Sequence, residues 1–424
     1  MSDDDPPDPQ PVLPDDARRA LDRIDAADLV VGIPTLDNAA TIDGVITAVE
    51  VGLRKLFPDM RAVICVSDGG SEDGSRSVAA AAGVGDRAER FLVPPSTRAP
   101  EVIVFRYGGI PGKGSALRGV FECVRALGAG ACAVLDADLR SITPYWIDRL
   151  LTPVVHHGFE FVAPLYVRHR HDGTITNSVA HPLTAALYGS RIRQPIGGEF
   201  AMSGDVALHF DEADVWETDV ARFGIDLWMT TVSLVEGRRV CQSILGAKLH
   251  DPKDPGRSLG PMFREVVGTC FALAERYADR WRGVDEVTTS PTFGFSSAVV
   301  PEPVIVSVAR LRQRFEEGRE RWEPTWRRLL SPELLDRAVA GDLDAETWIG
   351  VVYDELAAWA AGEDHAEVLG SLLPLYFAWT ARFAERTAHV AEREVDAEVQ
   401  LLVDAAVRQK PRLLSRWPAH AAAG

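Results

Sequence analysis

Short apolar runs and segments with one polar face alternate along the first two thirds of the chain. The apolar runs are rich in branched residues and predict buried strands at 28–34, 61–67, 102–105, 133–135 and 161–166. Helices are expected before and between them, among them 18–27, 41–56 and 77–82. Strands that alternate with helices predict an α/β fold, with a mostly parallel, Rossmann-like sheet flanked by helices.

Beyond about residue 305 the pattern changes to a helical period. Amphipathic stretches such as 308–326 and 366–391 carry many Glu and Arg residues on their polar faces. We therefore expect an acidic, proline-rich and disordered leader with a short helix (1–27), an α/β domain (28–300) and a helical C-terminal region (301–424). The helical region is interpreted as a packing or oligomerisation surface, and its tryptophans are expected in the core: Trp322, Trp326, Trp348 and Trp359.

Charge and composition narrow the classes of partner. The 424 residues carry a net charge of −17, which argues against general binding to nucleic acids or anionic membranes. An anionic substrate would then need a locally basic site or a metal ion. No apolar run approaches the roughly 18 residues that span a bilayer. The 5 cysteines show no C-x-x-C spacing, so buried free thiols and a cytoplasmic location are expected.

Two carboxylates follow the apolar run 133–135. Asp136 and Asp138 are two positions apart, and side chains at that spacing share one face of an extended chain. Ligands of open α/β sheets bind at the carboxyl ends of the strands. Two oxygen ligands at this edge suit Mg²⁺ or Mn²⁺ held with the phosphates of a nucleotide. The alternative is a plain strand end, with Asp138 capping a turn before Pro144.

Further polar residues lie where a nucleotide site would need them. Asp37 and Asp68 follow the first two predicted strands and support a nucleotide-binding half of the sheet. Lys113 stands between glycines before a predicted helix, where its charge and the helix amino end could meet a diphosphate. The segment does not match the P-loop pattern, because glycine follows the lysine. A flexible surface loop is the alternative.

The second half of the α/β region holds candidates for the other substrate. Gly197 and Gly198 precede Glu199, a pattern that suits close approach of the backbone to a small polar ligand and also suits a plain turn. Asp226 is a lone acid in an apolar helix, either a site residue or an acid favoured by the helix dipole. His250 follows a strand and could give a metal a nitrogen ligand, or serve as a structural hydrogen-bonding residue.

The motifs occur in one recognisable order. Pro-broken strand, Ser-Asp-Gly-Gly-Ser, Pro-Gly-Lys-Gly, Asp-Ala-Asp, Gln-Pro-Ile-Gly-Gly-Glu, Gly-Ile-Asp and Lys-Leu-His follow one another between about residues 29 and 270. This set resembles the GT-A glycosyltransferases that make osmolyte glycerates: glucosylglycerate, glucosyl-3-phosphoglycerate and mannosylglycerate synthases. The resemblance implies a GT-A fold and a hexosyltransferase of the EC 2.4.1 type. One departure is Leu36-Asp37-Asn38, where the group often has Asn-Glu, so the base is left open.

The resemblance implies a role for each residue of the nucleotide site. Pro34, Asp37 and Asp68 would line the base and ribose pocket. Lys113 would contact the diphosphate, and Asp136 would lie against the nucleotide sugar.

It also implies the metal and acceptor groups. Asp138 and His250 would ligate the Mg²⁺ or Mn²⁺. The donor sugar and acceptor would meet Gly197, Gly198 and Glu199, with Asp226 near the acceptor hydroxyl. Lys113, Glu199 and Asp226 are the catalytic candidates. The acceptor's carboxylate would be held by Arg168, Arg170 or Lys248.

The expected reaction is transfer of glucose or mannose from a UDP-, GDP- or ADP-linked sugar to D-glycerate or 3-phosphoglycerate, with retention of anomeric configuration. The metal would neutralise charge on the departing diphosphate. By analogy, a homodimer is expected. Two alternatives stay open: a nucleotidyltransferase on a Rossmann-like scaffold, and a catalytically silent protein that binds nucleotide sugars.

Overall fold

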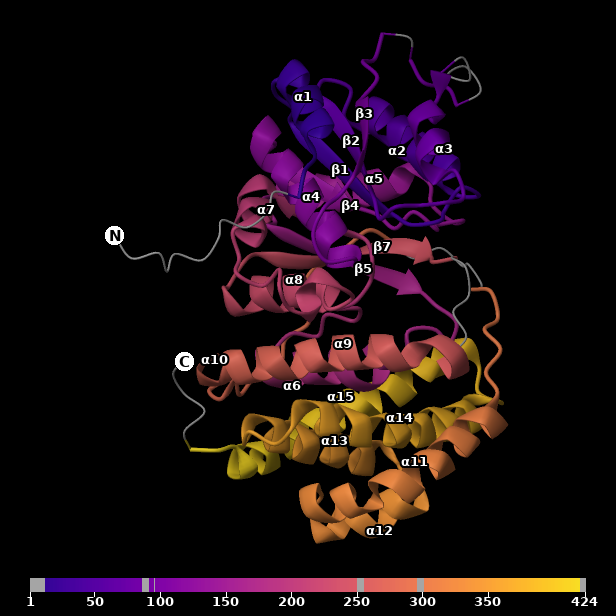
Figure 1. The fold of residues 1–424 in the computed structure, drawn as a ribbon, viewed down its shortest axis with the longest axis vertical. Coiled ribbons are helices and arrows are strands. Elements are labelled where there is room, and N and C mark those ends of the chain that lie inside the picture. Colours follow the sequence, from indigo (N-terminus) through magenta and orange to yellow (C-terminus); the bar gives the residue numbers. More distant parts are fainter. Residues whose placement is uncertain (1–11, 86–90, 95, 250–254, 296–300, 420–424) are drawn as a thin grey trace. The chain divides into compact units, whose positions relative to one another are not determined.

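The computed structural model describes residues 12–85, 91–94, 96–249, 255–295 and 301–419. Their contacts divide the chain into two compact units, one of Met1–Val162 with Gly198–Ile225 and the other of Ala163–Gly197 with Asp226–Gly424. Figure 1 shows the course of the chain through both. The predicted disordered leader falls mostly outside the described residues. The short helix predicted at 18–27 is α1 (Asp15–Ile24).

The first unit is built on a mainly parallel sheet. β1 lies at its centre, between β2 and β4, and both neighbours run parallel to it. β3 extends the sheet in parallel beyond β2, while β6 pairs with β4 in the antiparallel sense and with the first two residues of β5. The strands are β1 (Leu29–Thr35), β2 (Ala62–Asp68), β3 (Glu101–Arg106), β4 (Ala131–Val134) and β6 (Phe200–Ser203), together with Phe161 and Val162 of β5 (Phe161–Val167), whose other residues belong to the second unit.

Two groups of helices cover this sheet. α4 packs with α1 and α7, and α2 packs with α3 and α5 (Figure 1). The buried branched residues of β1 and β2 form the centre of the core, as their continuous apolar runs predict. The helices are α2 (Ile42–Leu56), α3 (Ser75–Ala81), α4 (Lys113–Leu127), α5 (Pro144–His157) and α7 (Gly204–Asp211).

Strand register determines which residues meet at the carboxyl edge of the sheet. Thr35 at the end of β1 is paired with Asp68 at the end of β2, and Asp68 is paired with Arg106 at the end of β3. β4 ends at Val134, opposite Gly32 of β1. The residues that follow β1, β2 and β4 therefore leave the sheet at one edge, as the parallel order predicts.

The second unit is mostly helical. β7 (Val240–Ala247) lies between β5 and β8 (Thr292–Phe293), and it runs parallel to β8. The other elements are η2 (Thr176–Ala180), α6 (His181–Tyr188), α8 (Ile225–Val235), α9 (Pro255–Arg276), α10 (Ala278–Trp281), α11 (Val308–Leu329), α12 (Pro332–Ala340), α13 (Ala345–Ala360), α14 (His365–Thr387) and α15 (Glu392–Arg416). The predicted class, α/β with a helical C-terminal region, is confirmed.

The two units divide the chain elsewhere than at the predicted boundary near residue 300. The reason is that α9, which precedes that boundary, packs against the C-terminal helices α13 and α14. Phe271 of α9 lies edge-on to Trp359 at 5.8 Å, and the Trp359 indole N–H donates to Glu275 at 3.0 Å. α9 therefore belongs with the helical region, because it packs on helices that follow the predicted boundary in the sequence.

Three of the four tryptophans expected in the helical core are there. Trp326, Trp348 and Trp359 are buried, whereas Trp322 is half-buried and lines a pocket. The expectation for Trp322 was wrong, because its ring rests at the edge of the contact between α11 and α14. No helix within the described ranges is long and apolar enough to cross a membrane.

Candidate functional site

Asp68 organises the loop after β2. It is fully buried, and its carboxylate accepts hydrogen bonds from the N–H of Gly70 at 2.9 Å and of Ser71 at 3.1 Å. The Ser71 hydroxyl also donates to it at 2.5 Å. Both carboxylate oxygens are thus engaged by the glycine-rich loop. Asp68 shapes the backbone at the sheet edge, and its part in a base or ribose pocket stays a prediction.

The loop after β1 is tied to the loop after β2. Asp37 adopts a left-handed conformation (φ 52°), and its carboxylate accepts the N–H of Glu72 at 2.9 Å. Its own N–H donates to Ser71 Oγ at 2.9 Å. The Ala39 N–H donates to Asp73 at 2.8 Å. Hydrogen bonds from the Ser75 side chain and from Ala39 hold the pKa of Asp73 below its ordinary value. Pro34 lies just before this loop, half-buried and paired with Ser67.

Two residues beside these loops were missed by the sequence reasoning. A Cβ added at Gly69 would lie 3.3 Å from the Tyr107 hydroxyl and 3.4 Å from Leu36 Cδ1, so both side chains approach this glycine. Leu36 is 58% exposed. An aromatic ring and an apolar side chain beside a glycine suit a flat group such as a nucleobase. The only signal in the sequence is an apolar residue directly after the Pro-broken strand.

Lys113 and Asp136 form an ion pair. The lysine Nζ lies 2.8 Å from Asp136 Oδ1, with side chains 15% and 23% exposed. This contact joins the Pro-Gly-Lys-Gly segment, where α4 begins, to the Asp-Ala-Asp segment after β4. Two motifs separated in sequence thus place one cation and one carboxylate together at the carboxyl edge of the sheet.

The glycines beside Lys113 are explained by a close backbone contact. A Cβ at Gly112 would lie 2.5 Å from the Ala221 carbonyl oxygen, and one at Gly114 would lie 1.9 Å from that of Val220. The Gly114 N–H donates to the Arg222 carbonyl at 3.1 Å. The start of α4 therefore packs on the backbone of 220–222, including η3 (Asp219–Ala221), and this contact positions the lysine.

This contact gives a stability prediction. Gly114→Ala is expected to lower the free energy of unfolding by about 1–3 kcal/mol, because the added methyl group overlaps backbone and forces it apart. Gly44→Ala is the matched control: it lies in the exposed face of α2, and nothing is within 4 Å of its Cβ position. That change should raise stability by up to about 1 kcal/mol. Urea unfolding of both variants measures the difference, and equal effects would contradict the contact.

Asp138 lies in a turn after β4. The prediction that Asp136 and Asp138 share one face of an extended chain was therefore wrong. The strand ends at Val134, and the turn is fixed by the Thr41 hydroxyl, which donates to the Ala137 carbonyl at 2.7 Å. Asp136 is bound by Lys113, whereas the half-buried Asp138 carboxylate makes no hydrogen bond or ion pair with any other described residue. The alternative, in which Asp138 caps a turn before Pro144, is also wrong, since this carboxylate accepts no hydrogen bond from a described residue.

The chemistry of Asp138 fits a hard divalent cation. A half-buried carboxylate needs a counter-charge, and oxygen is the ligand that Mg²⁺ and Mn²⁺ prefer. The second predicted ligand, His250, lies outside the described residues. Among the residues that the structure does describe, no three His, Cys, Asp or Glu side chains gather as a metal cluster. Asp138 is thus the one predicted metal ligand whose surroundings are defined.

In the second unit, two cations converge on Gly197. The Gly197 carbonyl accepts hydrogen bonds from Lys248 Nζ at 2.8 Å and from Arg168 Nη2 at 3.2 Å. Both cations also lie over the Tyr166 ring, at 5.5 Å and 5.1 Å from its centroid. Lys248 is only 7% exposed. A buried lysine beside an arginine is a setting that attracts a carboxylate.

The Gln-Pro-Ile-Gly segment is held on β5. The Gln194 side chain accepts the Tyr166 N–H at 3.1 Å and donates to the Tyr166 carbonyl at 3.2 Å. A Cβ at Gly197 would lie 2.1 Å from Pro164 Cγ, so only glycine allows this approach. Of the three cations predicted for the acceptor, Arg168 and Lys248 meet here. Arg170 does not, because its guanidinium donates to the Thr387 carbonyl.

The remaining predicted residues lie where the chain passes between units. Gly198 has a φ of 98°, which glycine adopts without strain, and it begins a segment of the first unit with the fully buried Glu199. Asp226 is 5% exposed in the first turn of α8, in the second unit. Their roles toward sugar and acceptor stay predictions. All five cysteines are buried free thiols, as expected.

Comparison with solved structures finds similar chains at low identity. Glucosyl-3-phosphoglycerate synthase from Mycobacterium tuberculosis, in complex with Mn²⁺, uridine-diphosphate-glucose and phosphoglyceric acid, is 22% identical with a TM-score of 0.43, over 60% of this chain and 82% of that one. Its complex with Mn²⁺, uridine diphosphate and phosphoglyceric acid is 23% identical with a TM-score of 0.42, over 62% of this chain and 84% of that one. A structure described as a mycobacterial protein is 22% identical with a TM-score of 0.42, over 61% of this chain and 77% of that one. No family model and no curated protein matches.

Proposed function

We propose that the chain is a divalent-metal-dependent glycosyltransferase that moves a hexose from a nucleoside-diphosphate sugar to D-glycerate or 3-phosphoglycerate. The observation that carries the proposal is the Lys113–Asp136 ion pair beside Asp138, whose carboxylate lacks a partner among the described residues. A cation and a metal-ligating carboxylate at the carboxyl edge of a parallel sheet are what a nucleoside diphosphate needs.

The residues of the first unit would bind and stabilise the departing nucleoside diphosphate. Asp138, with His250, would hold Mg²⁺ or Mn²⁺, which supplies Lewis-acid stabilisation when bound. Lys113 adds a positive charge that is already oriented by Asp136, so little reorganisation is needed as charge develops on the leaving phosphate. Leu36 and Tyr107 would line the pocket for the base, beside Asp37.

The residues of the second unit would hold the acceptor. Arg168 and Lys248 supply two cations beside Gly197, and these suit the carboxylate of glycerate. In a retaining reaction the acceptor hydroxyl attacks from the side that the diphosphate leaves, and the departing phosphate takes the proton. No carboxylate nucleophile is then required. Asp226 would orient the acceptor hydroxyl.

The cysteines bear on the compartment in which the proposed enzyme works. Five buried free thiols support a reducing, cytoplasmic environment. A homodimer through the helical region is proposed by analogy with the group, and light scattering measures it. Uridine diphosphate glucose and phosphoglyceric acid, held by the similar solved structures, are the first substrates to test.

The test is release of nucleoside diphosphate in a grid of UDP-, GDP- and ADP-sugars against D-glycerate, 3-phosphoglycerate and no acceptor. One donor and one acceptor are expected to give release together, and chelator should abolish it until Mn²⁺ or Mg²⁺ is returned. Pyrophosphate release from a nucleoside triphosphate would show a nucleotidyltransferase instead. Donor binding with no release under any combination would show a silent binding protein.

A further inference from the structure

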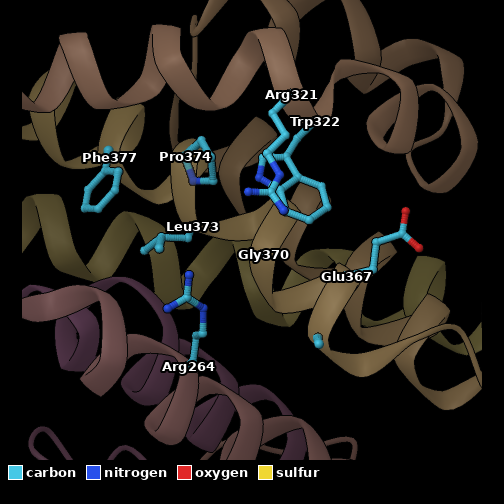
Figure 2. Close-up of a pocket in the computed structure, with 9 residues that line it drawn as sticks. Arg264, Arg321, Trp322, Glu367, Gly370, Leu373, Pro374 and Phe377 are labelled. Carbon is cyan, nitrogen blue, oxygen red and sulfur yellow. The ribbon is translucent and has the colours of Figure 1, made fainter.

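A pocket lies in the helical unit, among α9, α11 and α14. Its volume is about 370 Å³, within the range of about 300–1,000 Å³ that small-molecule sites occupy. Figure 2 shows Arg264 reaching into it from α9, with Arg321 and Trp322 opposite on α11. The lining residues are Arg264, Arg321, Trp322, Ala366, Glu367, Gly370, Leu373, Pro374 and Phe377.

The pocket is positively charged in an acidic protein. Within the described part of the chain, Arg264 and Arg321 have no carboxylate partner, and Arg314 lies 5.5 Å over the Phe377 ring, also without one. Other arginines of α11 are paired with acids: Arg312, Arg319, Arg327 and Arg328. Arg264 and Arg321 line the pocket and Arg314 does not, so two guanidiniums without an acid are left there to bind an anion.

The one acid of the lining is already compensated. Glu367 accepts the Thr325 hydroxyl at 2.8 Å and pairs with Arg328 at 2.9 Å. These hydrogen bonds, from Thr325 first and then Arg328, hold the pKa of Glu367 below its ordinary value. Glu367 therefore stays ionised and bound to the wall, and it does not neutralise Arg264 or Arg321.

Flat and apolar groups form the rest of the pocket. The Trp322 ring is half-buried with the Arg321 guanidinium 4.8 Å above it, and Leu373 and Phe377 are buried beneath. Stacked aromatic rings and guanidinium planes are the surfaces on which the bases of nucleotides lie.

Close helix packing holds this wall in place. A Cβ at Gly370 of α14 would lie 2.7 Å from the Trp322 ring, and a Cβ at Gly318 of α11 would lie 2.2 Å from Pro374 Cγ. Trp322 of α11 thus packs on Gly370 of α14, and Pro374 of α14 packs on Gly318 of α11. Pro374 also has no N–H to donate to the Gly370 carbonyl, which leaves that oxygen able to accept from a ligand.

We propose that this pocket binds a phosphorylated small molecule with a flat ring, of the nucleoside monophosphate class. Arg264 and Arg321 bind the phosphate through paired N–H donors, the ring stacks beside Trp322, and the Gly370 carbonyl accepts from the ring's edge. The site is separate from the residues proposed for sugar transfer, and it stands whether or not that proposal holds.

Calorimetric titration with adenosine 5′-monophosphate tests the pocket. The wild-type protein is expected to bind it, and Lys113→Ala should bind it equally, because that change affects only the proposed diphosphate site. Arg264→Gln with Arg321→Gln should weaken binding at least about tenfold, since charge-assisted hydrogen bonds to phosphate are lost. Arg312→Gln, an exposed arginine of the same helix, is the matched control and should bind like the wild type.

Two further probes separate the ring from the phosphate. Adenosine and inorganic phosphate should each bind more weakly than the nucleotide, because each lacks one half of the contacts. No binding of the nucleotide by the wild type, or equal binding by the double variant, would overturn the proposal. Adenosine bound as tightly as the nucleotide would overturn the role of the arginines. Both arginines are exposed, and Arg321→Gln alone gives a milder second test.

Discussion

Asp138→Asn is expected to lower kcat/KM for hexose transfer by roughly two to three orders of magnitude while the fold is kept. The wild-type carboxylate is half-buried and makes no bond to another described side chain, so its replacement breaks no contact that the described structure shows. An amide binds a divalent cation more weakly than a carboxylate. A metal contributes several kcal/mol to stabilising charge on a leaving phosphate, and each 1.4 kcal/mol is about tenfold in rate.

The measurement is the rate against Mn²⁺ concentration. Asp138→Asn should need much more Mn²⁺ for half of its maximal rate, whereas a merely structural change would lower the rate without moving this midpoint. Asp59→Asn, an exposed aspartate before β2, is the control for loss of one negative charge. An unchanged rate and midpoint in Asp138→Asn would remove this residue from the metal site.

Strands β1 and β2 were predictable because their sequence signals are local. They are continuous branched runs closed by turn residues, and the predicted and observed limits differ by about one residue. β6 (Phe200–Ser203) was not predicted. The limits of β4 were predicted less well. Its apolar run continues to Leu135, but the strand stops at Val134, where the chain enters the turn held by Thr41. A hydrogen bond from a residue so far away in sequence leaves no local pattern.

The site was predictable as a set of residues but not as a set of contacts. Lys113 and Asp136 were each expected to face the nucleotide, and their pairing with one another required the fold. Arg170 belongs to the same basic cluster as Arg168, yet it bonds the Thr387 carbonyl. Long side chains reach partners in any direction, so sequence proximity alone does not tell which arginines serve a site. Tyr107 was missed because a lone tyrosine after a strand has no distinguishing neighbour.

Two neighbouring acids on α13 are equally buried and differ in their bonding partners. Asp354 is fully buried, but it accepts the Ser331 N–H at 2.8 Å and the Arg412 guanidinium at 3.1 Å, so its charge is matched. Glu355 is equally buried, and from the described side chains it accepts one hydrogen bond, from the Ser371 hydroxyl at 3.0 Å. Burial, which penalises the charged form most, raises the pKa of Glu355 to about 8.

Glu355→Gln is therefore expected to change how stability depends on pH. In the unfolded chain Glu355 loses its proton near pH 4.5, whereas in the folded protein it keeps the proton until about pH 8. Between these values the folded state binds one more proton, so this group's contribution to stability is complete below pH 4.5 and is lost as pH rises toward 8. The slope is about −1.4 kcal/mol per pH unit, on the order of 5 kcal/mol over the window.

The difference between variant and wild type isolates this group from the other titrating residues. Glutamine is close to the protonated glutamate in shape and has no proton to lose. The free energy of unfolding of Glu355→Gln, relative to that of the wild type, should therefore rise steadily from pH 4.5 to 8 and stay constant above pH 8. Urea unfolding at a series of pH values measures it. Glu320→Gln, at an exposed acid on α11, is the control for loss of one carboxylate. A difference between Glu355→Gln and the wild type that does not change with pH would mean that the Glu355 carboxylate is ionised in the fold at neutral pH, with its charge met by a group other than Ser371.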